Sequence, residues 1–476
     1  KPENVTQLQL RVSELEEIAT QFSSEIEYIK NYDTLTGLPN QLLFFDRISQ
    51  VIERGSRHYL IAAILVVDIG MISQINNTLG RAAGDKLLLE ISARLNATFR
   101  SYDGVTRLTL SRFGGDEFAV LLTELPSKET VTWMVKRLLD SLEAPVEIDG
   151  NSIFLSGHVG VSMYPSDAGS VDELINKAMI AKQYSKKGHT DTSYQFFDHS
   201  MQEISNKHLK LDKELRLAIK NEEWELLYQP KLDIKTMSII GAEALIRWKH
   251  PTRGLLSPFE FIEFAEQRGL IVAIGDWVIK TACQQLYEWT KLGFTDCKIA
   301  VNLSAVQLRQ DDFVGKVFHT LATTGVPPRR LELEVTETML MYNFQSAMAA
   351  LKRLNSRGIT ISIDDFGTGY SSLSYLKNLP INTLKIDGTF IKDICNNEND
   401  KQIVKALIIM AHSMNLLVVA EGVEEQNQFN LLARYGCDEI QGYLLSKPVS
   451  AKEMTAMLST PPAFIANSAV NFSYDN

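Results

Sequence analysis

The sequence predicts an α/β protein with three parts: a coiled-coil helix over residues 1–30, an α/β sandwich over 31–200, and a (β/α)8 barrel over 208–460. Three observations support this prediction. A heptad seam opens the chain, strand and helix patterns alternate around a Gly-Gly hairpin, and eight apolar runs each end in a polar residue. Residues 461–476 are small, polar and aperiodic, so we expect a disordered tail.

The composition of the 476 residues is that of a globular protein. Apolar residues make up 45% and charged residues 22%, which excludes a wholly disordered chain, a collagen-like repeat and a disulfide scaffold. The formal charge of −10 argues against general binding of DNA or RNA through a basic face. It is compatible with a phosphate-bearing substrate, because bound divalent metal ions can supply the positive charge.

Cysteine usage and hydropathy bear on where the protein works. The four cysteines form no CxxC pair, so neither a zinc ribbon nor a redox motif is predicted, and we expect the reducing cytoplasm. No apolar stretch reaches about 18 residues, so no membrane span is predicted. Because the chain starts at Lys1 without Met, we expect it to be the end of a longer protein whose preceding part holds a sensory or membrane region.

The first segment, residues 1–30, carries the heptad seam. Apolar residues recur at alternating spacings of three and four, as in a left-handed coiled coil. They are Val5, Leu8, Val12, Leu15, Ala19, Phe22, Ile26 and Ile29. The pattern predicts a signalling helix that dimerises the chain. The alternative is a single amphipathic helix that lies on its own domain.

The second segment, residues 31–200, mixes strands with helices. Apolar and β-rich runs predict strands at 61–69, 105–113, 118–125 and 153–165, and a helical pattern covers 83–99. The second and third strands flank Gly114-Gly115-Asp116-Glu117, which predicts a hairpin. This mixture of elements predicts an α/β sandwich.

The third segment, residues 208–460, holds eight apolar strand-like runs separated by helical stretches, which predicts a (β/α)8 barrel. The active site of such a barrel lies at the C-terminal ends of its strands. The polar residues that fall there are Glu243, Asn302, Glu334, Asp364, Asp365, Lys385, Asp387, Glu421 and Gln441.

These mouth residues indicate metal-dependent phosphoester chemistry. Six carboxylates would repel one another unless a cation lay between them. The candidate ligands are oxygens, without His or Cys, which favours Mg²⁺ or Mn²⁺ over Zn²⁺. So many carboxylates favour two ions, which clamp the attacking and leaving oxygens of a displacement. Lys385 can position or deprotonate the attacking water, or neutralise developing charge. The alternative is that these acids only cap strands or form surface ion pairs.

The sequence Glu243-Ala244-Leu245, followed by Arg247-Trp248, resembles the signature of EAL domains, the cyclic-di-GMP phosphodiesterases. Further motifs of that family occur in order: YQPK (228–231), VNLS (301–304), ELEVTET (332–338), DDFGTGYSSL (364–373), LKID (384–387), AEGVE (420–424) and QGYLLSKP (441–448). The resemblance covers roughly residues 208–460. It implies an enzyme that hydrolyses cyclic-di-GMP to linear 5'-pGpG.

The same resemblance implies roles for single residues. Two Mg²⁺ or Mn²⁺ ions would be held by Glu243, Asn302, Glu334, Asp364, Asp365 and Glu421. Lys385 would activate water, and Glu337 would hold the loop over 364–372. Contacts to the dinucleotide would come from Gln229, Arg247 and Gln441, with Asp387 beside the second metal; the planar fork of arginine suits a phosphate.

In the second segment, Gly114-Gly115-Asp116-Glu117-Phe118 resembles the GGDEF signature of diguanylate cyclases, and DTLTGLPN (33–40) resembles another motif of that family. A Gly-Gly turn lets the backbone approach a nucleotide phosphate, and the two acids offer oxygens to a metal. The resemblance implies that GTP binds at Asn76, Asp85, Gly114 and Gly115, with Mg²⁺ on Asp68 and Asp116.

Several positions depart from the cyclase pattern. Ser73 stands where a Lys is expected near the triphosphate, and Gly70, Asn77 and Arg81 replace Asp, Asp and His. Val105 and Leu108 stand where the inhibitory RxxD would lie. Loss of a cation where charge develops impairs phosphoryl chemistry. We therefore expect an impaired or inactive cyclase domain that binds GTP and regulates the barrel.

Three functions remain open from the sequence. The first is a cyclic-di-GMP phosphodiesterase with a regulatory GGDEF domain. The second is a bifunctional enzyme that also makes cyclic-di-GMP from GTP. The third is a non-catalytic receptor for cyclic-di-GMP. The expected partners are cyclic-di-GMP, GTP and a second copy of the chain.

Overall fold

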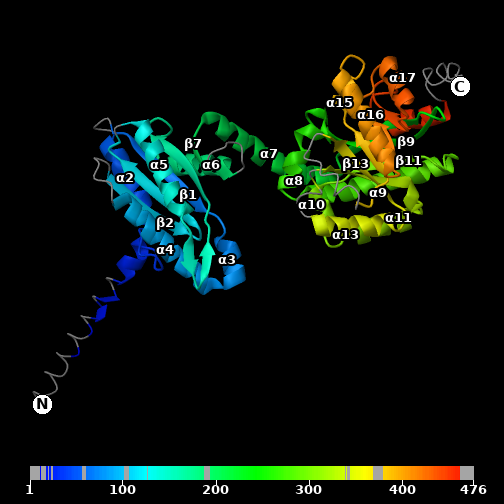
Figure 1. The fold of residues 1–476 in the computed structure, drawn as a ribbon. Coiled ribbons are helices and arrows are strands. Elements are labelled where there is room, and N and C mark those ends of the chain that lie inside the picture. The colour runs from blue at the N-terminus through cyan, green and yellow to red at the C-terminus, as the bar shows by residue number, and fades with distance from the viewer. Residues whose placement is uncertain are drawn as a thin grey trace, which may run out of the picture. The chain divides into compact units, whose positions relative to one another are not determined.

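The computed structural model describes residues 25–55, 60–100, 107–125, 127–186, 193–337, 344–367 and 379–460, with single positions 11, 15, 18, 19, 21, 22 and 339. The chain divides into two compact units, residues 1–207 and 208–476 (Figure 1). Helix α7 (His199–Asn221) runs through this division. Most of the predicted coiled coil and the whole predicted tail lie outside the described residues.

The first unit is a five-stranded sheet in the order β2-β3-β1-β6-β7. Its strands are β1 (Ala62–Ile69), β2 (Arg107–Gly114), β3 (Glu117–Thr123), β6 (Gly157–Tyr164) and β7 (Tyr194–Phe196). Its helices are α2 (Gln41–Gly55), α3 (Ile72–Leu79), α4 (Arg81–Arg100), α5 (Lys128–Glu143) and α6 (Val171–Lys186), and a small ribbon pairs β4 (Val146–Ile148) with β5 (Asn151–Ile153).

Strand β1 shows why this unit is layered. All eight of its residues are buried. Alternate side chains point to opposite faces of a strand. Ala63, Leu65 and Val67 therefore pack with α4 and α5, whereas the intervening Ala62, Ile64 and Val66 pack with α2 and α6. The result is the predicted α/β sandwich, with helices on both faces of the sheet.

The second unit is a closed eight-stranded barrel (Figure 1), which confirms the predicted fold class. Its strands are β8 (Trp224–Asp233), β9 (Ser238–His250), β11 (Lys298–Asn302), β12 (Leu331–Thr336), β13 (Thr360–Phe366), β14 (Thr383–Ile386), β15 (Leu417–Ala420) and β16 (Glu439–Gln441), with β10 (Gly254–Leu256) on the edge of β9. The described helices around it are α8 (Ile262–Gln267), α9 (Ile271–Lys291), α10 (Ala305–Leu308), α11 (Phe313–Thr324), α13 (Phe344–Asn355), α15 (Gly388–Lys392), α16 (Glu398–Ser413), α17 (Gln426–Tyr435) and α18 (Ala451–Ser459), with short 3-10 turns at Pro258–Glu260 and Pro328–Arg330.

One strand departs from an all-parallel barrel. Strand β8 runs antiparallel to both of its neighbours, β9 and β16. Only residues 234–237 separate β8 from β9, and a connection this short joins antiparallel strands, because a parallel pair needs a crossover of a dozen or more residues. Residues from the middle of β8 therefore reach the level of the mouth, and Gln229 lies opposite Glu243.

Charged side chains occupy part of the barrel interior, where bulky apolar residues are usual. Lys231, Glu332, Glu334 and Lys385 are all buried. On β16, Glu439 is half-buried, and this burial raises the pKa of Glu439 to about 7 although nearby Lys231 opposes the shift.

The N-terminal helix exposes its predicted seam. The described seam residues Leu15, Phe22, Ile26 and Ile29 are each more than half exposed. Among the described helices, none is both long enough and apolar enough to cross a membrane.

We predict that Glu439 makes the stability of the barrel depend on pH. Its pKa is raised on folding, so the folded state holds a proton between about pH 4.5 and pH 7 that the unfolded state has lost. Stability should fall as pH rises through this window, by up to about 3 kcal/mol. In Glu439→Gln the fall between pH 5 and pH 8 should be smaller than in the wild type, as urea unfolding followed by tryptophan fluorescence will show.

The matched control is Glu288→Gln, because the Glu288 side chain is 57% exposed on α9. This variant should keep the wild-type pH dependence. If Glu439→Gln and the wild type lose the same stability between pH 5 and pH 8, Glu439 is not the group responsible.

Candidate active site

The barrel brings most of the predicted mouth residues together. Glu243 lies on β9, Asn302 ends β11, Glu334 lies on β12, Asp364 on β13 and Lys385 on β14. Glu421 directly follows β15, and Gln441 ends β16. The parallel register pairs Asn302 with Glu334. These side chains converge because alternate residues of each strand point into the barrel.

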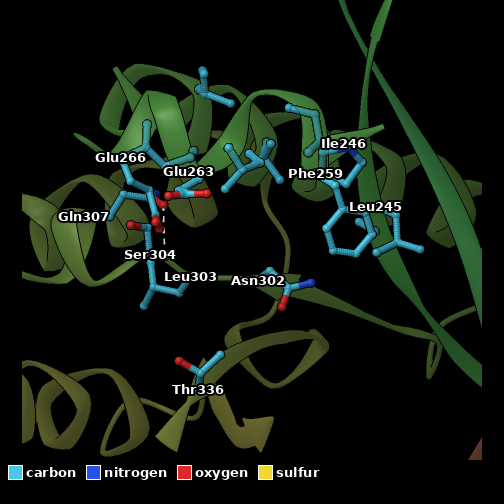
Figure 2. A pocket seen from close by; sticks show the side chains of 17 residues that line it. Leu245, Ile246, Phe259, Glu263, Glu266, Asn302, Leu303, Ser304, Gln307 and Thr336 are labelled. Carbon is cyan, nitrogen blue, oxygen red and sulfur yellow. Dashed lines mark hydrogen bonds between the residues drawn. The ribbon is translucent and has the colours of Figure 1, made fainter. Parts of the chain in front are cut away.

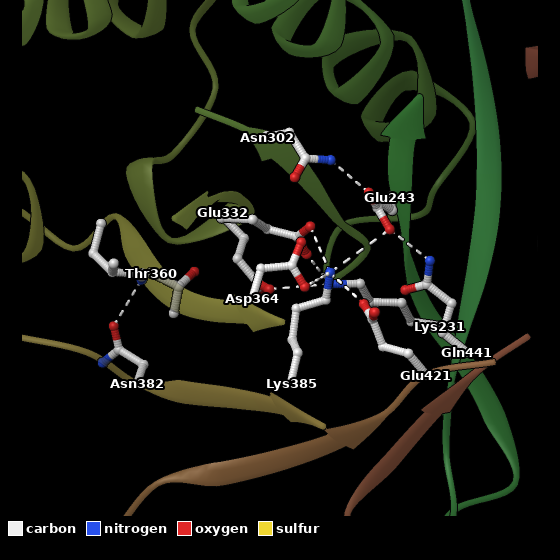
Figure 3. A network of polar contacts seen from close by, with 12 residues as sticks. Lys231, Glu243, Asn302, Glu332, Thr360, Asp364, Asn382, Lys385, Glu421 and Gln441 are labelled. Atoms are coloured by element: carbon white, nitrogen blue, oxygen red, sulfur yellow. Dashed lines mark hydrogen bonds and ion pairs between the residues drawn. The ribbon is translucent and has the colours of Figure 1, made fainter. Parts of the chain in front are cut away.

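Lys385 lies at the centre of this group (Figure 3). Its Nζ is 2.5 Å from Glu421 Oε1, 2.7 Å from Glu334 Oε2 and 3.0 Å from Asp364 Oδ1. A fourth carboxylate oxygen, Oε2 of Glu243, is 3.7 Å away. The Lys385 side chain is 1% exposed, so these carboxylates replace the water that would otherwise solvate its charge.

Glu243 is held by two amides (Figure 3). Asn302 Nδ2 donates to Oε1 of Glu243 at 2.6 Å, and Gln441 Nε2 donates to Oε2 at the same distance. Gln441 Nε2 also donates to Gln229 Oε1 at 3.1 Å. The two amides therefore fix the orientation of the carboxylate.

The charges shift one another's pKa values strongly. Burial alone would lower the pKa of Lys385, but the carboxylates around it raise that pKa well above its ordinary value. Burial would raise the pKa of Glu334, but Lys231 and Lys385 lower it to about 2. Burial raises the pKa of Glu421 to about 8, which Lys385 only partly opposes. Burial and the neighbouring Glu334 raise the pKa of Glu243.

Three carboxylates are arranged to hold a divalent cation. One oxygen each from Asp364, Asp365 and Glu421 lie within 4.8 Å of one another. Burial and Asp364 raise the pKa of Asp365 to about 6, and its backbone has a positive φ of 53°. A site built from hard oxygen ligands suits Mg²⁺ or Mn²⁺. Carboxylate repulsion of this kind is relieved when a cation binds.

Other predicted residues surround this centre. Gln229 Nε2 donates to the Ser446 carbonyl at 3.4 Å. Half-buried Arg247 donates from Nη1 to the Ile246 carbonyl at 2.8 Å, and burial lowers its pKa. Asp387 caps the N-terminus of α15 by accepting from the Thr389 amide at 2.9 Å.

The loop that Glu337 was predicted to hold is only partly described. Glu337 itself directly follows β12. The described start of the loop, Gly367, has a φ of 99°, which favours glycine. Residues 368–378 lie outside the described residues, so the role of Glu337 stays a prediction.

An apolar cavity of about 470 Å³ has the mouth residue Asn302 in its lining (Figure 2). Leu245, Ile246 and Phe259 line one side, and Asn302 lies on its wall. Phe259 is 96% exposed. No sequence motif indicates this cavity, because its lining comes from separate elements whose apolar residues are also typical of an ordinary core.

Lys231 and Glu332 also belong to the charged interior, and no role was predicted for either. Lys231 Nζ lies 2.8 Å from Glu334 Oε1 and 3.0 Å from Glu332 Oε1. A signal was present in the sequence. In LELEVTE and in YQPK, polar residues recur at every second position of an otherwise apolar strand, which marks an inward face.

The first unit gathers charges at the ends of β1 and β3. Asp68 and Glu117 lie opposite each other in the antiparallel register. Lys182 pairs with Glu117 and lies 3.8 Å from Asp68 Oδ2, and Lys186 Nζ is 3.0 Å from Asp68 Oδ1. The register thus places Glu117 directly across from Asp68. Asp116, the predicted metal ligand, precedes Glu117 in the chain.

Specific contacts hold the Gly114–Gly115 hairpin and the predicted base-binding residue Asn76. Gly114 and Gly115 form the hairpin tip with positive φ values of 127° and 56°. Arg112 fixes this tip, since it pairs with Asp33 at 3.0 Å and donates to the Gly115 carbonyl at 2.9 Å. Asn76 packs against the N-terminal part of α4, which carries Asp85. Its Oδ1 lies so close to Gly84 that a Cβ there would be 2.0 Å away.

Comparison with known proteins assigns both units to families. The family model described as "EAL domain" matches residues 212–448, and the one described as "Diguanylate cyclase, GGDEF domain" matches residues 30–192. The solved structure named "PaMucR Phosphodiesterase, c-di-GMP complex" is 44% identical, with a TM-score of 0.50, over 52% of this chain and 99% of that one. The chain belongs to the family of GGDEF–EAL proteins.

Two curated relatives from Pseudomonas aeruginosa span both domains. "Bifunctional diguanylate cyclase/cyclic di-GMP phosphodiesterase MucR" is 37% identical over 95% of this chain. "Cyclic di-GMP phosphodiesterase NbdA" is 38% identical over 90% of this chain. The chain covers 65% of the first relative's length and 54% of the second's.

We predict that Lys385 offsets the negative charge of the carboxylates at the mouth of the EAL barrel. Lys385→Met leaves buried carboxylates without their cation, so the barrel should lose about 3–5 kcal/mol of stability in EDTA. Mg²⁺ should then raise the melting temperature of this variant more than that of the wild type. Thermal unfolding in EDTA and in MgCl2 measures both effects.

The control is Lys291→Met, which removes a lysine that is 51% exposed and pairs with Glu288 on the surface of α9. This variant should have the same melting temperature as the wild type in both buffers. Equal melting temperatures for Lys385→Met and the wild type in EDTA would show that the carboxylates do not need Lys385.

Proposed function

We propose that the EAL domain hydrolyses cyclic-di-GMP to linear 5'-pGpG with the help of divalent cations. The observation that carries the proposal is the group of carboxylates around Lys385, with Asp364, Asp365 and Glu421 close enough to share an ion. The relatives named as cyclic-di-GMP phosphodiesterases support the choice of substrate.

The cations would be held by Asp364, Asp365 and Glu421, with Glu243, Asn302 and Glu334 as the further ligands. Bound Mg²⁺ or Mn²⁺ would activate water and stabilise charge on the phosphate. Glu334 can serve a cation and both lysines at once, because each carboxylate oxygen has two lone pairs.

Lys385 acts in this scheme as a hydrogen-bond donor. Its pKa is raised well above the ordinary value, so the ammonium stays protonated. It can orient the attacking water and stabilise the negative charge that develops on the phosphate. The proton that the water loses needs a carboxylate acceptor. Glu421 is placed for this part, since its Oε1 lies 2.5 Å from Lys385 Nζ.

Substrate contacts would come from the rim of the mouth. Arg247 would bind a phosphate through its guanidinium fork. Gln229 and Gln441 would contact the dinucleotide, and Asp387 would lie beside the second cation. One orphan atom supports this assignment: Oε1 of Gln441 is buried and accepts no hydrogen bond from the described residues. A ligand donor would satisfy it.

The direct test incubates the protein with cyclic-di-GMP and MgCl2 or MnCl2 and separates the products by chromatography. We expect 5'-pGpG, and none in EDTA. Glu243→Gln and Asp364→Asn should lower kcat at least about 100-fold, because each removes a charge from the mouth. Glu288→Gln is the control and should leave the rate unchanged. A wild-type protein that binds cyclic-di-GMP without forming product would instead be a receptor.

We propose that the GGDEF domain binds GTP and regulates the barrel. Asn76 and Asp85 would bind guanine, the Gly114–Gly115 tip would approach the phosphates, and Asp68 and Asp116 would hold Mg²⁺. Lys182 and Lys186 would supply positive charge near Asp68, whereas Ser73 supplies none. The exposed seam residues Leu15, Phe22 and Ile26 support a dimer of this chain through its N-terminal helix.

Titration with GTP and Mg²⁺ by calorimetry tests the regulatory role. We expect binding that Asp85→Ala weakens at least about tenfold, because a hydrogen-bonded charged contact is lost. GTP should also change the rate of 5'-pGpG formation by the wild type but not by Asp85→Ala. Absence of both binding and rate change would rule out GTP as the regulator. Formation of cyclic-di-GMP from GTP would show a bifunctional enzyme.

A further inference from the structure

Two lysines share one glutamate inside the barrel. Glu334 Oε2 lies 2.7 Å from Lys385 Nζ, and Glu334 Oε1 lies 2.8 Å from Lys231 Nζ. The Glu334 side chain is fully buried. Both of its oxygens are therefore fixed by ammonium groups from two different strands, one from β8 and one from β14.

Lys231 lies one layer deeper than the mouth. It follows Gln229 by two residues on β8, so both side chains point inward, and it lies opposite Gln441 in the register with β16. Its second partner is Glu332, two residues before Glu334 on β12. Lys231 is 4% exposed, and its ion pairs among the described residues are with Glu332 and Glu334.

Stability alone gives a poor reason for this arrangement. A buried ion pair is often no more stabilising than well-packed apolar residues of similar volume, because desolvation offsets the attraction. Barrel interiors at this level are ordinarily filled by Val, Ile and Leu. What the Lys231 charge does provide is a fixed position for the carboxylate that faces Lys385.

We propose that Lys231 is a positioning residue for the phosphodiesterase reaction, which holds Glu334 so that the Lys385 ammonium stays on the opposite oxygen at the centre of the mouth. The inference rests on the proposed function of the EAL domain. Without Lys231, Oε1 of Glu334 loses its donor and the carboxylate is free to turn. Lys385 can then shift toward Glu243, whose nearer oxygen is 3.7 Å away. A shift of the Lys385 ammonium of about 1 Å lowers kcat, and it leaves the substrate contacts at the rim in place.

Three variants separate positioning from charge balance. Lys231→Met removes the donor. Lys231→Met/Glu332→Gln removes the donor together with one buried negative charge, so the net charge of the interior is kept. Glu332→Gln alone removes the second partner but leaves Lys231 on Glu334. Each is measured as the full chain for melting temperature, and for kcat and KM with cyclic-di-GMP and Mg²⁺.

We expect Lys231→Met and the charge-balanced pair to lose about 10- to 100-fold in kcat with KM within about threefold of the wild type. Glu332→Gln should keep kcat within about twofold. If Lys231→Met does not fold, the charge-balanced pair decides the question. A pair that folds and turns over at the wild-type rate would overturn the inference, and so would a Glu332→Gln variant as slow as the pair. A wild type without any turnover would instead refute the proposed phosphodiesterase.

Discussion

Charge compensation around the Lys385 ammonium is the constraint on which the rest of the barrel depends. Glu334, Asp364 and Glu421 each place an oxygen within 3.0 Å of Nζ, in surroundings that water barely reaches. None of these groups can be buried charged without the others, because an unpaired charge in the interior is strongly unfavourable. The strands must therefore bring them to one level, and the register of the closed sheet does so.

The same constraint explains the unusual interior beneath the mouth. An excess of carboxylates above is matched by a second lysine below, and Glu334 links the two. The antiparallel β8 is what delivers Lys231 and Gln229 to this position. The short β8–β9 turn makes β8 antiparallel to β9. The register of β8 then decides which of its side chains face inward, and those side chains balance the charge.

Much of this could be predicted from the sequence, for identifiable reasons. Apolar runs that end in polar residues predicted the barrel and placed Glu243, Lys385 and Glu421 at its mouth, because period and position determine where such residues point. The Gly114–Gly115 turn likewise predicted the hairpin. The direction of β8 was missed, since an apolar run says nothing about whether its neighbour lies parallel.

The features that could not be predicted from the sequence are contacts between residues far apart in the chain. The Lys231–Glu334 contact joins residues 103 positions apart, and the pairing of Lys182 with Glu117 joins residues 65 apart. No local pattern encodes such partners. The raised pKa values of Glu421 and Asp365 are equally invisible before burial is known.

We propose that the carboxylates around Lys385 form a cation site for phosphoester hydrolysis. The most direct measurement is a crystal structure of the chain with Mn²⁺ and cyclic-di-GMP, in which anomalous scattering locates the metal. We predict an anomalous peak within about 2.0–2.4 Å of oxygens from Asp364, Asp365 and Glu421, with a phosphate of the dinucleotide beside it. A dinucleotide bound at the mouth with no metal at these carboxylates would contradict the account.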